Sequence, residues 1–260
     1  MTIKKAQLHI HSNYTDGLYS VETILKEARK RKFDVISITD HNEIRGTIRA
    51  FELAKKYNLF AIPGIELYFK INNRIYDLLI YFKEIRDLKN FFTNFRRAEE
   101  FIPCFKDINE LVRKIKKYKG IIVIPHPYDN RKGLFKNNGL KENIFKNFDG
   151  VETIDAFNSK IQNEKAENYF KNKEILKFGG CDLHIYLSSL EYAYTLLNSK
   201  NKINYDSILN NLTGKKKTIQ FIAKGIALSS WKRKLQESIC IFLIGFFITK
   251  QVLKFKLKIK

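Results

Sequence analysis

Hydrophobic positions recur along the first third of the chain in two alternating periods, which predict alternating strands and helices. Short runs rich in apolar residues predict strands at residues 7–11, 34–40 and 59–67. Between them, apolar residues three and four positions apart predict helices at residues 20–30, with Ser20 as the cap, and at residues 44–54. The order strand, helix, strand, helix, strand is typical of parallel βα units.

The same pattern continues further along the chain, so we expect one compact α/β domain over residues 1–200. Asp107 and Glu110 form a capping pair that begins a helix, and Gly120 ends it. The other predicted elements are strands at residues 74–82, 121–126, 150–157, 177–184 and 192–197, and helices at residues 91–102 and 163–173. In barrels of parallel βα units, the active site lies at the C-terminal ends of the strands.

The last part of the chain, residues 201–260, is predicted to be a separate C-terminal extension. It contains an unbroken apolar run at residues 239–249, flanked by WKRK and KFKLKIK. Eleven apolar residues are too few to span a bilayer, which takes about 20. A helix that packs on the domain or on a dimer partner, and an interfacial contact of residues 231–260 with an anionic membrane, are the two interpretations. The oligomeric state is not predicted.

Charge favours an anionic partner. The chain has 48 Lys and Arg against 27 Asp and Glu, a formal net charge of +21. Such a field attracts phosphorylated small molecules, nucleic acid or anionic membranes, although a basic solvated surface without a partner has the same composition.

Cysteines and the N-terminus indicate a cytoplasmic protein, in the membrane interpretation a peripheral one. The three cysteines, Cys104, Cys181 and Cys240, are far apart and form no C-x-x-C pair, so neither a disulfide framework nor a thiolate zinc site is expected. The first residues run directly into the first strand without the apolar core of a signal peptide.

The five histidines carry the chemistry, because each ends or closely follows a predicted strand. His9 and His11 are two residues apart, so on a strand both side chains project from one face, and Asp16 follows in a Thr-Asp-Gly turn. The histidines and carboxylates expected at the mouth of the barrel are His9, His11, Asp16, Asp40, His41, Glu66, Asp77, His126, Asp182 and His184. Imidazoles and carboxylates without thiolates favour two or three divalent ions of Mn, Fe or Zn.

Residues 5–200 resemble the PHP family, the polymerase and histidinol phosphatase domain. The similar segments are, in order, HIHSNYTDG, ITDHNEIRG, GIEL, IPHPYDN and GCDLH. The resemblance implies a distorted seven-stranded βα barrel, similar to a TIM barrel, that holds a trinuclear site. It assigns His9, His11, Glu66 and Asp182 to the first ion, Glu66 and His126 to the second, and Asp16, His41 and His184 to the third. Asp40 is then a partner that orients ligands.

Two positions depart from the family's pattern. Asp77 stands where many phosphoesterase members have a histidine ligand of the second ion, which leaves the occupancy of that ion open. Cys181 replaces the common serine of the G-S-D-x-H segment, and we interpret it as a small residue rather than a nucleophile.

The predicted reaction is hydrolysis of a phosphate ester by a metal-bridging hydroxide. Arg131 and Lys132, in the loop after His126, are candidates to bind a phosphoryl oxygen, although a solvated loop charge is the alternative for each. Arg45 is a weaker candidate. The expected substrate is a nucleotide or the 5′ end of a short oligonucleotide.

Three alternatives stay open. They are a small-molecule phosphatase of histidinol-phosphatase type, an amidohydrolase, and a non-catalytic, metal-stabilised module that binds nucleic acid or a membrane.

Overall fold

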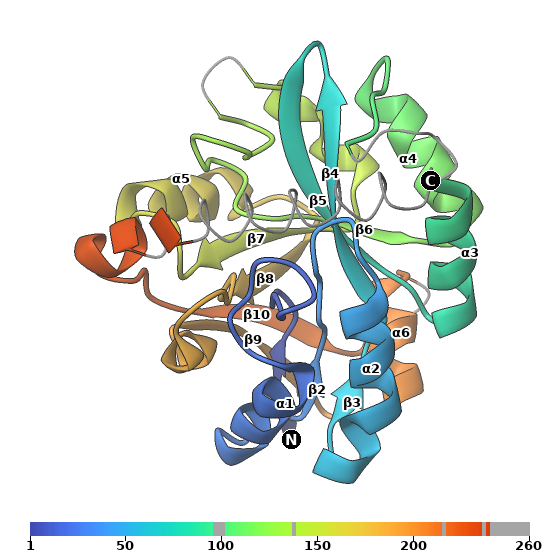
Figure 1. The fold of residues 1–260 in the computed structure, drawn as a ribbon, viewed down its shortest axis with the longest axis vertical. Coiled ribbons are helices and arrows are strands. Elements are labelled where there is room, and N and C mark those ends of the chain that lie inside the picture. Colours follow the sequence, from blue (N-terminus) through green and yellow to red (C-terminus); the bar gives the residue numbers. More distant parts are fainter. Residues whose placement is uncertain (96–101, 137–138, 215–216, 236–237, 240–260) are drawn as a thin grey trace, which may run out of the picture.

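The computed structural model describes residues 1–95, 102–136, 139–214, 217–235 and 238–239, whose strands form two five-stranded sheets (Figure 1). The first sheet has the order β10 (Gln220–Gly225), β9 (Ala193–Ser199), β1 (Thr2–Gln7), β2 (Val35–Ile36) and β3 (Phe60–Ala61). The second has the order β4 (Gly64–Ile71), β5 (Arg74–Tyr81), β6 (Ile121–Ile124), β7 (Gly150–Asp155) and β8 (Leu176–Gly180).

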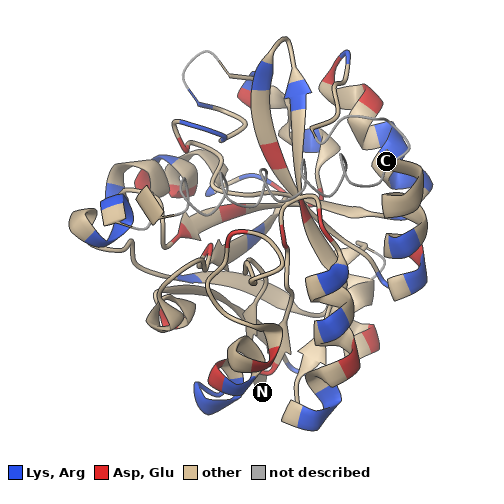
Figure 2. Ribbon diagram, in the orientation of Figure 1, with Lys and Arg blue, Asp and Glu red and all other residues tan. Residues whose placement is uncertain are grey.

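Helices lie around the outside of the sheets (Figure 1). The described α-helices are α1 (Val21–Lys30), α2 (Arg45–Leu53), α3 (Ile85–Phe95), α4 (Ile108–Lys117), α5 (Lys160–Phe170) and α6 (Tyr205–Leu212). Short 3₁₀ turns are η1 (Ala54–Tyr57), η2 (Glu142–Asn147) and η3 (Leu187–Glu191). Figure 2 shows that lysine and arginine are spread over the outer helices, whereas acidic residues also occur on strands near the centre of the view.

Single-residue bridges join the two sheets at two places. Ile10, beyond β1, pairs with Leu183, beyond β8, and His41, beyond β2, pairs with Glu66 in β4. Together with the sheet pairings, these bridges close a ring in the order β1, β2, β4, β5, β6, β7, β8. The predicted distorted seven-stranded barrel is therefore confirmed, and β3, β9 and β10 extend the first sheet outside the ring.

The barrel is not parallel throughout, in contrast to the expectation from the βα pattern. β5 runs antiparallel to both β4 and β6. Asn72 and Asn73, with φ of 51° and 61°, make the two-residue turn between β4 and β5. Two successive positive φ angles are typical of a tight hairpin, which leaves no room for a crossover helix.

The predicted strand at residues 59–67 is divided between the two sheets. Pro63 lies between β3, which pairs with β2, and β4, which pairs with β5. Proline has no N–H to donate to a ladder, so the chain leaves the first sheet at this residue. The carbonyl of Pro63 accepts a hydrogen bond from the backbone N–H of Phe82 at 2.9 Å, which attaches the crossing point to the second sheet.

Both predicted helix caps are confirmed. The Ser20 hydroxyl accepts from the N–H of Thr23 at 3.3 Å, and the Asp107 carboxylate accepts from the N–H of Glu110 at 2.8 Å. The predicted helix at residues 163–173 is α5, which begins earlier because Ser159 and Gln162 form a capping box. The predicted helix at 91–102 corresponds to the end of α3, and its residues 96–101 lie outside the described part.

α6 and β10, which follow position 200, pack on the first sheet. β10 pairs antiparallel with β9 from Gln220 to Gly225, and α6 buries Ile208, Leu209 and Leu212. The first sheet therefore includes described residues as far as Gly225. Of the predicted apolar run at residues 239–249, all but Ile239 lies outside the described residues. Within the described ranges, no helix is long and apolar enough to cross a bilayer.

Candidate metal centre

His9 and His11 lie on an extended segment between β1 and the first loop. β1 ends at Gln7, but the chain stays paired beyond it, because Ile10 forms a bridge with Leu183 and the N–H of His11 donates to the carbonyl of Leu183 at 2.9 Å. Ile10 is fully buried on one side, and the two imidazoles, also fully buried, contact each other on the other. The predicted two-residue spacing therefore brings both rings into one pocket.

Four side chains meet around these rings in the first group of potential ligands, which comprises His9, His11, Glu66 and Asp182. Nε2 of His9 lies 3.4 Å from Glu66 and 3.3 Å from Asp182, and Nε2 of His11 lies 3.1 Å from each of these carboxylates. Ligands about 2.1 Å from one ion are separated by about 3.0 to 3.4 Å along the edges of an octahedron or tetrahedron. The spacing of this group matches the coordination shell of a single divalent ion.

The second group comprises Glu66, Asp77 and His126. Nε2 of His126 lies 3.5 Å from Glu66 and 3.8 Å from Asp77. Asp77 is expected at the mouth of the barrel, where strands end, but it lies in the middle of β5, opposite Tyr68 of β4. The β4–β5 hairpin extends to the top of Figure 1, and the Asp77 carboxylate still lies within 3.8 Å of Nε2 of His126.

The third group comprises His11, Asp16, His41 and His184. Asp16 lies 3.1 Å from Nε2 of His184 and 3.5 Å from Nε2 of His41. Glu66 also reaches this group, since its second oxygen lies 2.9 Å from Nδ1 of His41. The structure thus brings all nine predicted metal ligands into one pocket with Glu66 at its centre, and their ligation of ions stays a prediction.

Buried polar atoms in the pocket fit a set of cations. Among the described residues, His9 Nε2, both ring nitrogens of His11 and both carboxylate oxygens of Asp16, Glu66 and Asp77 are buried and make no hydrogen bond of acceptable geometry. Leaving a buried polar group without a partner lowers the stability of the fold. Most of these atoms lie within one cluster, where bound cations would serve as their partners. Imidazole nitrogens and carboxylate oxygens are the ligands of Mn, Fe and Zn, so the residues fit the predicted ions.

Electrostatics in the pocket also indicate a site for positive charge. Burial lowers the pKa of His41, but Asp16 and Glu66 outweigh it and raise this pKa to about 9. Burial likewise lowers the pKa of His126, and Asp77 and Glu66 raise it to about 10. Burial raises the pKa of Asp77 to about 6, while His126 opposes the shift. Protons on His41 and His126 therefore offset part of the carboxylate charge when no ion is bound.

The two predicted phosphate-binding residues point in different directions. The ammonium group of Lys132 hydrogen-bonds to the Tyr68 hydroxyl and lies 3.5 Å from Asp77, so it faces the metal pocket. Burial lowers the pKa of Lys132, but the carboxylates, Asp77 foremost, raise it overall, which keeps the group cationic. The guanidinium of Arg131 lies 5.3 Å from the centre of the Phe157 ring and 3.7 Å from the Asp129 carboxylate. The structure therefore brings Lys132 to the potential ligands.

Asp40 lies behind the ligands and shapes the loop that connects them. Its carboxylate accepts hydrogen bonds from the backbone N–H of Ser12 at 2.6 Å and from the hydroxyls of Ser12 and Thr15 at 2.7 and 3.0 Å. This loop connects His11 to Asp16. Asp40 is thus placed to position two potential ligands, and its role in orienting them stays a prediction. Arg45, the weaker candidate, pairs with Glu43 at 2.7 Å.

Sequence reasoning missed Glu152 and Asp155, two buried acids on β7. Glu152 lies 3.1 Å from Nδ1 of His9 and accepts from the backbone N–H of His126 at 3.1 Å. With His9, the two acids form a further group of potential ligands. Burial raises the pKa of Asp155 well above its usual value, and Glu152 adds to this shift. The available signal was two acids within a strand that is otherwise fully buried.

Cys181 is buried, and its thiol is in an environment that disfavours the reactive thiolate. Its thiol donates to the carbonyl of His9 at 3.4 Å, and burial raises the pKa of the thiol well above its usual value. This agrees with its interpretation as a small residue that replaces serine.

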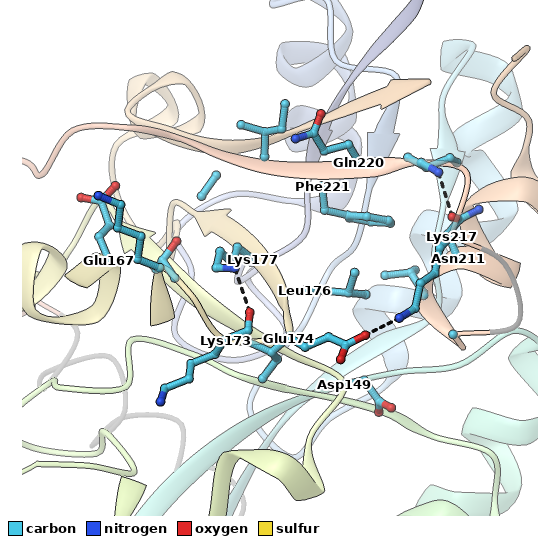
Figure 3. Close-up of a pocket in the computed structure, with 18 of the residues that line it drawn as sticks. Asp149, Glu167, Lys173, Glu174, Leu176, Lys177, Asn211, Lys217, Gln220 and Phe221 are labelled. Atoms are coloured by element: carbon cyan, nitrogen blue, oxygen red, sulfur yellow. Dashed lines mark hydrogen bonds and ion pairs between the residues drawn. The ribbon is translucent and has the colours of Figure 1, made fainter. Parts of the chain in front are cut away.

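A cavity of about 930 Å³ lies away from the histidines, between α5, the beginning of β8, α6 and β10 (Figure 3). Its charged side chains have both signs, and Lys217 pairs with Glu174 at 2.5 Å. It contains none of the groups of potential metal ligands found among the described residues. The metal pocket is therefore the better candidate for the chemistry.

The sequence matches the PHP domain over residues 7–224. An uncharacterized protein of Methanocaldococcus jannaschii is 30% identical over 165 residues, which cover 59% of this chain and 82% of the relative. A second uncharacterized protein of the same organism is 27% identical over 186 residues, with 69% of this chain and 65% of the relative covered. The DNA polymerase III subunit alpha of Buchnera aphidicola is 34% identical over 100 residues, 36% of this chain but 9% of the polymerase subunit.

Solved structures share the fold at low sequence identity. A two-domain Bacteroides vulgatus protein, described as containing a predicted PHP-like metal-dependent phosphoesterase, has a TM-score of 0.64 at 18% identity, covering 86% of this chain and 65% of that one. The lesion-specific endonuclease Q of Pyrococcus furiosus has a TM-score of 0.63 at 15% identity, covering 86% and 59%. The chain thus spans less than two thirds of either protein.

Proposed function

Because this chain belongs to the PHP domain family, we propose that it is a metal-dependent phosphoesterase that hydrolyses the phosphate ester of a nucleotide or of the 5′ end of a short oligonucleotide. The observation that carries the proposal is the shared position of Glu66, whose carboxylate lies within 3.5 Å of His9, His11, His41 and His126. A carboxylate has two oxygens, so Glu66 can serve neighbouring ions at once.

The ions would be held by the three groups around Glu66. His9, His11, Glu66 and Asp182 would hold the first, Glu66, Asp77 and His126 the second, and Asp16, His41 and His184 the third, with His11 at its border. Such ions lower the pKa of water and neutralise charge that develops on a phosphoryl group.

Protein groups complete the pocket. The Lys132 ammonium, held beside Asp77 and Tyr68, is placed to bind a non-bridging phosphoryl oxygen at the edge of the ligand cluster. The Tyr68 hydroxyl contacts both the Lys132 ammonium and Nε2 of His41, the latter at 2.7 Å. It therefore fixes the position of the Lys132 ammonium relative to the third group of ligands. Glu152 orients His9 from behind.

A nucleotide or oligonucleotide substrate is supported by charge and by one neighbour. The net charge of +21 favours an anionic partner. Endonuclease Q, a structural neighbour with a TM-score of 0.62, was solved with a 27-mer duplex that carries an abasic lesion at its active site.

Phosphate release tests the proposal. The full chain, loaded with Mn, should release inorganic phosphate or mononucleotides from nucleotides and 5′-phosphorylated oligonucleotides. A His9→Ala variant that stays folded should lose this activity, whereas Lys117→Ala, on the exposed surface of α4, should keep it. Release from small sugar or amino-alcohol phosphates alone would favour the histidinol-phosphatase alternative. No release from any phosphate ester would contradict the proposal.

A further inference from the structure

A groove with a volume of about 650 Å³ lies beside the metal pocket. Its walls are the loop after β6, the N-terminal half of α5 and residues 230–235, and the last two lie side by side at the left of Figure 1. Basic side chains come from all three walls. Figure 2 shows Lys and Arg positions, in blue, along the ribbon of α5 and of residues 230–235. They are Arg131, Lys136, Lys165, Arg233 and Lys234.

The loop after β6 connects this groove to the metal pocket. The Asp129 carboxylate accepts the backbone N–H groups of Arg131 and Lys132, both at 2.9 Å, which fixes the direction of both residues. Lys132 then points into the metal pocket, and Arg131 points towards Phe157 in the groove. Two consecutive cations therefore belong to adjoining surfaces, so a ligand bound at the first can continue into the second.

The groove has little negative charge to neutralise its cations. Asp129 is the one carboxylate among the described lining residues, against five cationic side chains. Lys165 and Lys234 are exposed, and Arg233 is anchored by a hydrogen bond of 2.7 Å to the carbonyl of Asn158. This balance differs from that of the 930 Å³ cavity, where Asp149, Glu167 and Glu174 stand among the lysines.

Aromatic rings support the cations rather than offering a surface for bases. The Lys165 ammonium lies 4.1 Å from the centre of the Tyr128 ring, and Arg131 covers Phe157. Tyr128 and Phe157 are themselves buried. A groove of this kind reads the charge of a phosphate backbone and not the identity of its bases.

We propose that this groove binds the phosphodiester backbone of a single-stranded nucleic acid, next to the nucleotide whose phosphate lies at the metal centre. The inference rests on the proposed function for the position of that nucleotide. The volume falls within the range of about 300 to 1,000 Å³ that holds small ligands, so it accommodates a few nucleotides of one strand and not a duplex. The chain is then selective for short strands over free mononucleotides.

Binding of a fluorescent ten-nucleotide single strand in the presence of a chelator tests the groove independently of hydrolysis. The variant is Lys165→Ala combined with Lys234→Ala, both exposed, in the full chain. The matched control is Lys117→Ala combined with Lys171→Ala, which removes the same charge elsewhere. We expect the groove variant to weaken binding roughly tenfold and to lower the salt dependence, as a log–log slope, by about 1.4, since each single-strand phosphate contact contributes about 0.7. The control should bind like the wild type.

Three outcomes would overturn the inference. They are unchanged binding by the groove variant, equal weakening by the control, or weakened binding to phosphatidylglycerol vesicles with the oligonucleotide unaffected. Hydrolysis assays separate this inference from the proposed function. If phosphate esters are hydrolysed while the groove variant binds the strand normally, only the groove fails. If no ester is hydrolysed, the proposed function fails, and the binding result still decides whether the groove holds a strand.

Discussion

The carboxylate of Glu152 holds His9 from behind, with its two oxygens 3.1 and 3.2 Å from Nδ1 of that ring. The opposite nitrogen of the ring, Nε2, faces Glu66 and Asp182. A proton on Nδ1 that is donated to Glu152 leaves Nε2 free of a proton and directed at the first group of ligands. The same carboxylate accepts from the backbone N–H of His126, so it connects the first and second groups.

Glu152→Gln is expected to weaken the tightest-bound ion by about 10- to 100-fold, as is usual when a partner of a ligand is lost. The amide has one accepting oxygen and no charge, so one of the two oxygen contacts with Nδ1 of His9 is lost. Metal titration monitored by calorimetry measures the change, and circular dichroism checks that the fold is kept. Glu167→Gln, on the exposed side of α5, is the control. Wild-type affinity in Glu152→Gln would show that the contact does not orient His9.

Gly180 has no side chain and so leaves room for the Glu152 carboxylate beside His9. A Cβ atom at this position would lie 1.8 Å from a Glu152 oxygen and 3.2 Å from Cβ of His9. We therefore expect Gly180→Ala to displace Glu152 and to cause the same loss of affinity that we expect for Glu152→Gln, with a lower melting temperature in addition. The double variant should lose little more affinity than either single variant, because both act through one carboxylate. Additive losses in a double-mutant cycle would contradict this.

Asp40→Asn should destabilise the loop between His11 and Asp16. The asparagine side chain has one accepting oxygen, so at least part of the bonding to Ser12 and Thr15 is lost inside a buried site. The expected loss is about 1 to 3 kcal/mol in the free energy of unfolding. Denaturant unfolding of the metal-free protein measures it. Thr15→Val, which removes one of the three bonds, should lose less, and an equal or larger loss would count against this account.

Much of the barrel was predictable because its signals are local. The caps at Ser20 and Asp107 and the spacing of His9 and His11 depend on neighbours within a few residues. The antiparallel direction of β5 also has a local signal, the Asn72–Asn73 pair between two apolar runs, which is typical of a two-residue hairpin turn. The βα pattern before and after this pair favoured a parallel strand instead, and that prediction was wrong for β5.

The missing residues of the site depend on contacts across the barrel. Glu152 and Asp155 lie on a strand that looks like any buried strand, and their partners are more than a hundred residues away or on neighbouring loops. Lys132 and Arg131 are adjacent in sequence and chemically alike, so only the fold separates the one that meets Asp77 from the one that meets Phe157. Long-range contacts of this kind leave no periodic trace in the sequence.

Metal binding should release protons, so the affinity of the site for metal ions should fall as the pH falls. His41 has a pKa of about 9 and His126 one of about 10, so below pH 9 both rings carry protons that an ion must displace. Affinity should therefore rise with pH between 6 and about 9, by up to about one log unit per pH unit for each proton displaced. Calorimetric titration with Mn in buffers of different ionisation enthalpy counts these protons. Uptake without proton release would contradict the expected charge state.

Lys132→Ala and Arg131→Ala should have different effects on hydrolysis, although the residues are consecutive. Lys132 lies inside the pocket between Tyr68 and Asp77, so its removal should lower kcat/KM for a mononucleotide by roughly a hundredfold, which is the usual effect of losing one charged group at a developing negative charge. The Arg131 guanidinium lies 5.3 Å from the centre of the Phe157 ring, and its removal should change the same constant by less than about threefold, in line with a contact outside the reacting centre. Steady-state kinetics with equal metal content in each variant measure both effects. The metal content has to be checked because Asp77, beside Lys132, belongs to the second group of ligands. Equal losses in the two variants would mean that the loop after His126 acts as one electrostatic unit, and Lys132 would then have no specific role at the phosphoryl group.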